Sequence, residues 1–298
     1  VAGALPPLNA EAWEKEFALY RETPQYKMVN AGMGLEDFKK IYFWEWLHRL
    51  WGRMIGIIYF APLAWFWLRG KIPQDKKRPL AIILALGFLQ GFMGWFMVKS
   101  GLVDEPAVSH YRLAAHLGLA FVIFCALVHT GLSFSAPPTN DKKMPSRLRR
   151  GIWALLALCG IAMMWGAFVA GLRAGRIYND EFPLMGKYLW PSEIFDMLPR
   201  WINFFENHAT VQFTHRCLGL LALAGASALV LSARRMDAPA HVRRLTALLL
   251  AVMAAQVFLG GATIVSHVNI AIAAGHQAGA MVILAVLTAL LYHSREKK

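Results

Sequence analysis

The sequence predicts an all-α polytopic membrane protein made of two related helical bundles, and three observations support this prediction. First, 57% of the 298 residues are hydrophobic, only 16% are charged, and the mean hydropathy is +0.42, which is too apolar for a soluble domain of this size. Second, basic residues gather at alternate ends of the apolar segments. Third, the two halves of the chain carry matching motifs.

Seven apolar segments are long enough to form membrane-spanning helices, which need about 20 mostly apolar residues. We expect them at 53–69, 78–98, 112–133, 149–171, 213–233, 243–265 and 272–293. Cys125, Cys159 and Cys217 fall within or at the edges of these segments, far apart in the sequence. Neither a disulfide framework nor a metal cluster is therefore indicated.

Clusters of Lys and Arg indicate which side of the membrane each connection faces. They occupy the segments 69–78, 142–150, 234–244 and 295–298. By the positive-inside rule these segments are cytoplasmic, or on the matrix side in a mitochondrion. The remaining segments then face outward, namely 1–52, 99–111, 172–212 and 266–271. The net charge of +13 thus reflects the orientation of the helices in the membrane. We therefore expect a lipid bilayer as partner and no nucleic acid.

An internal repeat relates the two halves of the chain. In order, Glu45–Gly52 matches Gln212–Gly219, Gln90–Gly94 matches Gln256–Gly260, and Arg112–Gly118 matches Ile272–Gly279. Because the order and register persist across half the chain, chance is a poor explanation.

The repeat predicts two pseudo-symmetric four-helix bundles. We place the N-terminal bundle at 1–138 and the C-terminal bundle at 139–298. The second copy contains four predicted spans and the first only three, so we expect a further span before Val1 in the full-length protein. The N-terminal stretch is typical of an outward loop with a helix starting near Leu35, and 172–212 of a structured outer cap.

Four histidines recur at matched positions in the repeat and lie in the first turns of predicted helices that run inward. An ionisable side chain inside a membrane helix is costly and marks function by default. The positions permit one pair in each half, His48 with His116 and His215 with His276. Two imidazoles that face each other across a bundle are the ligand set of a six-coordinate haem iron. For any single histidine, a polar contact with a neighbouring helix is an equally good interpretation, but recurrence of the pair favours haem.

One carboxylate distinguishes the two halves. Glu45 lies three residues before His48 and shares its helix face, whereas the position before His215 holds Gln212. A site that performs chemistry needs a proton carrier or an anion, so Glu45 is the candidate catalytic residue. The alternative is a salt bridge from Glu45 to Arg49 or Arg53.

Further polar residues accompany the histidines. Guanidinium groups suit the anionic propionates of haem, and the candidates at the outer helix ends are Arg49, Arg53, Arg112 and Arg216, with interfacial anchoring as the alternative. The matched Gln90 and Gln256 either contact the haem edge or join helices to one another.

The motifs resemble those of the haem A synthase family, in its alphaproteobacterial and mitochondrial class. The resemblance covers essentially the whole chain and lies in Glu45-x-x-His48-Arg49-x-Trp51-Gly52-Arg53, Gln90-Gly91-x-x-Gly94-Trp95, Tyr111-Arg112-Leu113-Ala114-Ala115-His116-Leu117-Gly118, Phe168-Val169-Ala170-Gly171-Leu172 and Phe205-Glu206-Asn207. Family members with a redox-active cysteine pair in an outer loop are not matched, because no cysteine lies in an outward loop here.

The resemblance implies an enzyme that oxidises a methyl group of haem O to a formyl group, giving haem A, with O2 and external electrons. It implies that His48 and His116 hold the substrate haem O, that His215 and His276 hold a haem b, and that Glu45 is required for turnover. It also implies eight spans, and as partners a haem O synthase and an electron donor, either ferredoxin-like or a quinol. A homo-oligomer in the bacterial cytoplasmic membrane, or in the mitochondrial inner membrane, fits the same picture.

Two other functions use the same four ligands. A di-haem b electron-transfer protein, linked to quinone, accounts for the histidines but not for Glu45. A non-catalytic haem carrier would bind haem and release it unchanged. Analysis of the products separates both from a synthase.

Overall fold

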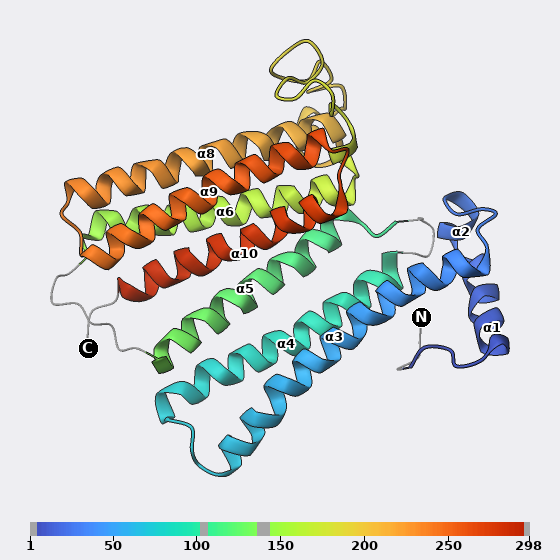
Figure 1. Ribbon diagram of the computed structural model, residues 1–298, viewed down its shortest axis with the longest axis horizontal. Helices are drawn as coiled ribbons and strands as arrows, with labels where there is room; N and C mark the ends of the chain where they lie inside the picture. The colour runs from blue at the N-terminus through green and yellow to red at the C-terminus, as the bar shows by residue number, and fades with distance from the viewer. Residues whose placement is uncertain (1–4, 102–106, 136–143, 295–298) are drawn as a thin grey trace. The chain divides into compact units, whose positions relative to one another are not determined.

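A computed structural model describes residues 5–101, 107–135 and 144–294, and helices dominate them (Figure 1). Residues 142–143 of the second basic segment and the tail 295–298 lie outside these ranges. The helices are α1 (Ala10–Arg21), α2 (Pro24–Met28), α3 (Leu35–Leu68), α4 (Gln74–Gly101), α5 (His110–Ser135), α6 (Ser146–Gly171), α7 (Asn203–Glu206), α8 (His208–Arg235), α9 (Ala240–Val265) and α10 (Ile270–His293), with 3-10 turns at Ala174–Arg176 and Arg200–Ile202.

Among the described residues, six helices are long and apolar enough to cross a membrane: α4, α5, α6, α8, α9 and α10. They contain six of the seven predicted spans, so the protein is a multi-pass membrane protein. The remaining span, 53–69, forms the second part of α3 and stays a prediction. Tyr59, Pro62, Trp65 and Trp67 lower the hydropathy of this part, although aromatic residues of this kind suit a membrane interface.

The chain divides into two compact units, Val1–Arg112 and Leu113–Lys298. The division falls before the body of α5 rather than at 138, because Ala114 of α5 packs against Ala167 and Phe168 of α6 and Val211 of α8. The division of the chain into bundles 1–138 and 139–298 was predicted from the repeat and assigns each helix to a haem site. That division stays a prediction.

In the first unit, α3 begins at Leu35, as predicted, and continues for 34 residues. At 1.5 Å per residue it is roughly 50 Å long, which exceeds the thickness of a bilayer core. Its first turns pack against α1 through the aromatic side chains of Phe17, Phe38 and Tyr42, which are almost fully buried. The start of α3 is therefore fixed by a small aromatic core formed with the N-terminal helices.

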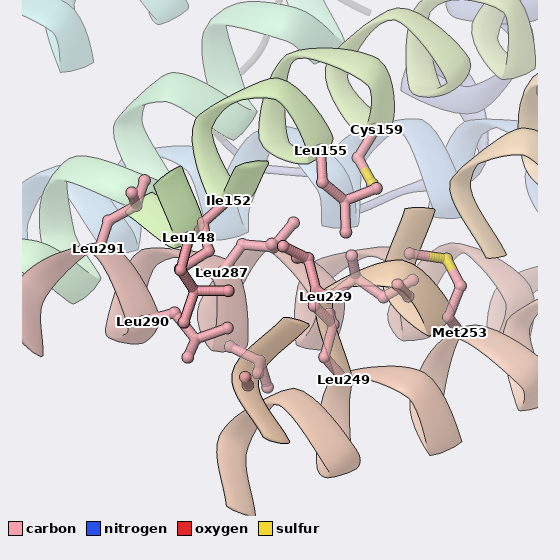
Figure 2. Packing of buried hydrophobic residues seen from close by; sticks show 14 of the residues in the cluster. Leu148, Ile152, Leu155, Cys159, Leu229, Leu249, Met253, Leu287, Leu290 and Leu291 are labelled. Carbon is pink, nitrogen blue, oxygen red and sulfur yellow. The ribbon is translucent and has the colours of Figure 1, made fainter. Parts of the chain in front are cut away.

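In the second unit, α6, α8, α9 and α10 form a four-helix bundle in which each helix contacts two others. Its core is an apolar cluster that draws on all four helices and includes Leu155, Leu229, Leu249 and Leu287 (Figure 2). Between membrane helices, close packing rather than expulsion of water holds such a core together. Along α6 the core positions Leu148, Ile152, Leu155 and Cys159 follow the helical period, and the same face continues to Ala162 and Gly166.

Candidate functional site

The bundle of the second unit brings His215 and His276 together. His215 lies in the second turn of α8, and His276 in the second turn of α10. Their ring centroids are 6.3 Å apart, and the ring planes are nearly perpendicular, at 88°. Both side chains are half-buried. The structure therefore places this predicted pair next to each other, in an edge-to-face arrangement, at one end of the bundle.

Each of the two rings is oriented by a backbone carbonyl on a neighbouring helix. His215 Nδ1 lies 2.9 Å from the carbonyl oxygen of Ala162 on α6, and His276 Nδ1 lies 3.0 Å from that of Gln256 on α9. Since a carbonyl can only accept a hydrogen bond, the proton of each neutral imidazole is on Nδ1. Nε2 is then the nitrogen available to bind a metal, and the hydrogen bond at Nδ1 raises its basicity.

Two glycines leave room for the imidazole rings of His215 and His276. A Cβ atom at Gly166 on α6 would lie 3.0 Å from Cε1 of His215, and one at Gly260 on α9 would lie 3.1 Å from Cε1 of His276. Gly260 belongs to the repeat motif. Gly166 was not singled out in the sequence, although its position on the core face of α6, seven residues after Cys159, is a signal that could have found it.

Replacing Gly166 with alanine is therefore expected to weaken binding of a metal group between the two histidines. The ring cannot retreat freely, because the Ala162 carbonyl one turn away holds its Nδ1. Gly160, on the same helix, is the matched control, since a Cβ atom there would meet no neighbouring group of the described residues within 4 Å. We expect Gly160→Ala to keep wild-type haem content per protein and Gly166→Ala to lose haem, as measured from the pyridine haemochrome spectrum. Equal haem content in the two variants would contradict the steric argument.

The spacing of the pair suits two ligands on opposite sides of one metal. A metal–imidazole bond of about 2 Å puts each ring centre about 3 Å from the metal, so opposed ligands have ring centres about 6 Å apart. The observed 6.3 Å agrees with this arrangement. Within the described ranges, no group of three or more His, Cys, Asp or Glu residues could hold a bare metal ion. Two imidazoles alone are the ligand set of a six-coordinate haem iron, so these residues fit haem.

Gln256 joins α9 to α10 at the histidine. Its backbone carbonyl accepts from His276 Nδ1, while its side-chain Nε2 donates to the carbonyl oxygen of His276 at 2.8 Å. Of the two interpretations of Gln256, the structure thus shows the helix-joining one. A contact of this side chain with a haem edge stays a prediction.

Gln212 and Arg216 fasten the segment predicted to be a cap, 172–212, to α8. Gln212, only 1% exposed, donates to the carbonyls of Ala174 and Ile177, both at 2.9 Å, and accepts from Arg216 Nη2 at 3.0 Å. Arg216 also donates to the carbonyls of Tyr178, Pro183 and Leu184. Its Nε is buried and has no hydrogen-bond partner among the described residues. The Arg216 guanidinium is therefore surrounded by carbonyl oxygens, and its Nε–H is the one donor not used by the described residues. Such a group suits a nearby anion such as a propionate.

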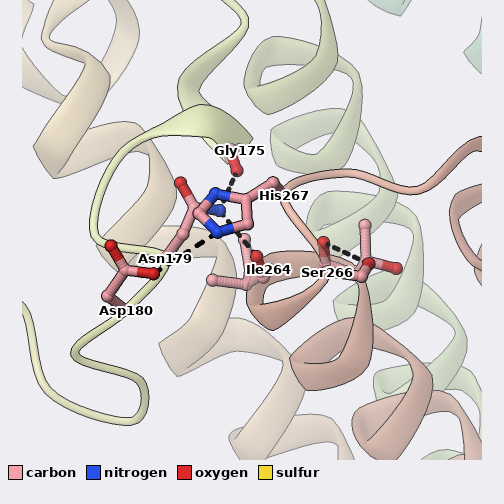
Figure 3. A network of polar contacts seen from close by, with 7 residues as sticks. Gly175, Asn179, Asp180, Ile264, Ser266 and His267 are labelled. Carbon is pink, nitrogen blue, oxygen red and sulfur yellow. Dashed lines mark hydrogen bonds and ion pairs between the residues drawn. The ribbon is translucent and has the colours of Figure 1, made fainter.

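Further contacts hold the cap at the end of α9 and at the turn that follows this helix (Figure 3). Asn179 donates to the carbonyls of Gly175 at 2.9 Å and Ile264 at 2.6 Å, and Asp180 lies 3.3 Å from Nε2 of His267. Phe182 fills the space beside Gly261, where a Cβ atom would lie 3.0 Å from the Phe182 ring. The segment after α6 is therefore docked directly beside the end of the bundle that holds the histidines.

The rest of the cap is held by one buried amide and one tyrosine. Asn203, fully buried, exchanges hydrogen bonds with the backbone of Met197 and donates to the carbonyl of Arg200. Tyr178 donates a hydrogen bond to Glu193 at 2.5 Å. Burial, together with this bond, raises the pKa of Tyr178 to about 12, and the same bond lowers the pKa of Glu193. The prediction that 172–212 is structured is confirmed, whereas its place on the outer side of the membrane stays a prediction.

The candidate residues of the first half lie in both units. Glu45, His48, Arg49 and Arg53 are on α3, and Gln90 is on α4, whereas His116 is on α5 in the second unit. The pairing of His48 with His116 therefore stays a prediction. Arg112 lies with its guanidinium 5.5 Å from the centroid of the Phe96 ring, and its propionate role is likewise untested.

Glu45 forms an ion pair with Arg49, one turn along α3, which is the alternative noted from the sequence. The side chain of Glu45 nevertheless stays 40% exposed and that of Arg49 31%. Gln212 and Arg216 are the matching residues of the second half. They are also four residues apart, and their hydrogen bond is partly buried. The repeat thus carries an amide–guanidinium pair in one half and a carboxylate–guanidinium pair in the other.

Fold and site together define a multi-pass helical membrane protein with a bis-histidine site of the kind that holds haem. Residues 1–288 match the model of the COX15-CtaA family, described as cytochrome oxidase assembly protein, and the chain belongs to this family.

Three of the similar curated proteins are named as haem A synthases. A haem A synthase of Rhodospirillum centenum is 47% identical over 292 residues, which cover 98% of this chain and 78% of the relative. A haem A synthase of Agrobacterium fabrum is 45% identical, and the match covers 95% of this chain and 77% of the relative. The haem A synthase COX15 of Arabidopsis thaliana is 42% identical, covering 98% and 66%. No solved structure matches the chain.

Proposed function

We propose that this protein is a haem A synthase, an enzyme that oxidises a methyl group of haem O to the formyl group of haem A. The observation that carries the proposal is the family match over residues 1–288, together with 42–47% identity to haem A synthases along nearly the whole chain. The paired imidazoles in the second unit support it, because an enzyme that acts on haem needs haem-binding helices.

The second half would hold a haem b, which when bound supplies reversible one-electron transfer. His215 and His276 would hold it, with their rings oriented by the carbonyls of Ala162 and Gln256. Arg216, half-buried and with one N–H that has no hydrogen-bond partner among the described residues, is the candidate partner for a propionate. The docked cap would exclude water from this end of the bundle, and a lower local dielectric strengthens such charge pairing.

The first half would bind the substrate through His48 and His116. Glu45 would assist proton movement, or stabilise positive charge that develops at the oxidised carbon, with Arg49 orienting the carboxylate. Iron with both axial positions filled by histidine cannot bind O2. Turnover therefore requires that one histidine leaves the iron or that the oxidant acts from elsewhere.

The proposal includes an outside supply of substrate and electrons. Haem O would come from a haem O synthase, and electrons from a ferredoxin-like protein or a quinol. The membrane would be the cytoplasmic membrane of a bacterium or the mitochondrial inner membrane, and the protein could act there as a homo-oligomer. The product would serve the assembly of cytochrome oxidase.

Product analysis tests the proposal. Full-length protein is expressed in membranes supplied with haem O, and the extracted haems are separated by chromatography with mass detection. We expect the alcohol and formyl haems with the protein present and neither in membranes without it. A membrane that accumulates only bound haem b would instead indicate a di-haem electron-transfer protein, and recovery of unchanged haem O would indicate a carrier.

A further inference from the structure

Three pairs of adjacent arginines lie at the end of the second unit's bundle that is opposite to His215 and His276. Each pair directly follows a core residue that is at most 1% exposed, namely Leu148, Ala233 or Val242. Because successive residues of a helix are about 100° apart, the two residues after such a core position point away from the core. The pairs are Arg149 and Arg150 on α6, Arg234 and Arg235 on α8, and Arg243 and Arg244 on α9, and all six residues are exposed.

These six arginines have few partners in the protein. Arg243 Nη1 lies 3.1 Å from Oδ1 of Asp237, whose side chain is 72% exposed. The other five form no hydrogen bond, ion pair or ring contact with the described residues. Asp237 is also the one acidic residue in 144–153 and 231–248. Exposed guanidinium groups with a single carboxylate among them suit anions from outside the protein.

The basic loop of the first unit, 69–78, differs in composition and in contacts. It contains three lysines, which serve the positive-inside rule as well as arginine does. Arg69 lies 4.3 Å from the centroid of the Trp65 ring. Lys77 lies 5.7 Å from that of Trp67. Arginine at all six positions of the second unit therefore exceeds what membrane orientation requires, and its planar group offers paired donors that match the oxygens of a phosphate.

A large apolar side chain lies about one helical turn deeper along the bundle from each arginine pair. These residues are Trp153 on α6, Leu231 on α8 and Leu248 on α9, each three or four residues from an arginine of its pair. They are 58%, 52% and 48% exposed. Residues three or four apart share a helix face, so each pair stands at the end of an exposed apolar strip. A phospholipid has the same order, with a charged phosphate next to an acyl chain, whereas a free phosphate leaves the strip uncovered.

We propose that the arginine pairs of α6 and α8 each bind an anionic phospholipid, with the guanidinium groups on its phosphate and an acyl chain along the apolar strip. The ends of membrane helices lie at the level of lipid headgroups, where basic side chains attract anionic lipids. The pair of α9 binds less tightly, because Asp237 already holds Arg243. Lipid binding does not require haem chemistry, so it succeeds or fails independently of the proposed function.

Native mass spectrometry of the purified full-length protein counts the bound lipids. Phosphatidylglycerol and phosphatidylcholine with identical acyl chains are titrated separately, since they differ in net charge. We expect the wild type to retain phosphatidylglycerol at concentrations where it retains no phosphatidylcholine. Arg149→Gln/Arg150→Gln and Arg234→Gln/Arg235→Gln are each expected to lose one bound phosphatidylglycerol, because an arginine near the headgroups contributes about fivefold in affinity and a pair about 30-fold.

Three comparisons separate a phosphate site from general attraction to charge. Arg149→Lys/Arg150→Lys keeps the charge but loses the paired donors, and is expected to bind about tenfold more weakly at α6. Arg176→Gln/Arg200→Gln removes the same charge from exposed positions of the cap, at the other end of the unit, and is expected to keep wild-type binding. Glycerol 3-phosphate, which has the phosphate without acyl chains, is expected not to displace the lipid.

Equal retention of the two lipids by the wild type would overturn the proposal, as would full retention of phosphatidylglycerol by both glutamine double variants. Wild-type binding in the lysine variant, or an equal loss in the cap variant, would indicate attraction to charge alone and would also overturn it. Displacement by glycerol 3-phosphate would overturn the choice of a lipid. Because the substituted residues are exposed, the variants should unfold at the wild-type temperature in phosphatidylcholine, and Arg150→Gln or Arg235→Gln alone replaces a double variant that does not.

Discussion

Replacing His276 with alanine is expected to abolish the proposed haem binding in the second half and to remove the absorbance that bis-histidine iron would contribute there. His215 would be left as a single axial ligand, and the space vacated beside Gly260 would not supply another. Changes to groups that merely hydrogen-bond a metal ligand typically cost about 10–100-fold in metal affinity, so loss of a ligand should weaken binding by about 100-fold or more. Haem content per protein and the reduced-minus-oxidised spectrum measure the effect.

His267 provides the control for this substitution. It lies just before α10, is 65% exposed, and pairs with Asp180 at the edge of the cap. Its φ of 53° is left-handed, so asparagine is a better replacement than alanine. His267→Asn is expected to retain haem. Full bis-histidine absorbance in His276→Ala would refute the ligand assignment, whatever the behaviour of the control.

The helices and the histidine pair of the second half could be predicted because they depend on patterns that the sequence displays directly. Apolar length identified α6, α8, α9 and α10, and the repeat identified His215 and His276. The span predicted at 53–69 in α3 stays a prediction, since its Trp and Tyr residues lower the hydropathy while they still suit an interface.

The groups that orient the histidines could not be predicted from residue type. The Ala162 and Gln256 carbonyls hold the two rings, and any residue at those positions would supply a carbonyl. Gly166 had no counterpart in the repeat. The cap posed a further problem, because Gln212 fastens carbonyls more than 30 residues earlier in the chain, and the conformation of the intervening loop decides that contact.

Gln212 and Glu45 occupy matching positions in the repeat, and the structure shows that their surroundings differ. In the second half the neutral amide of Gln212 is buried, forms its hydrogen bonds with the loop and with Arg216, and has no ionisable proton. In the first half a carboxylate at the matched position pairs with Arg49 but keeps 40% of its side chain exposed. A buried amide can only organise structure, whereas a partly accessible carboxylate can also exchange protons.

Substituting Glu45 with glutamine therefore converts the first half to the residue that the second half already has. Glutamine keeps the size of the side chain and a hydrogen bond to Arg49, as Gln212 does with Arg216, but removes the charge and the proton-carrying group. General acid–base groups typically contribute about 10²–10⁴-fold, so formation of haem A should slow by about 100-fold or more. The second-half haem should be unaffected. Chromatography of haems formed over a time course measures the rate.

Two further variants test whether Glu45 takes part in the reaction or only in the structure of α3. Glu36 on the same helix forms an exposed ion pair with Lys39, so Glu36→Gln removes a comparable charge away from His48 and should leave the rate unchanged. Arg49→Ala breaks the ion pair but keeps the carboxylate, and should slow the reaction much less than Glu45→Gln does. If Arg49→Ala were as slow as Glu45→Gln, the ion pair itself would be the functional unit, and Glu45 would be a structural residue rather than a catalytic one.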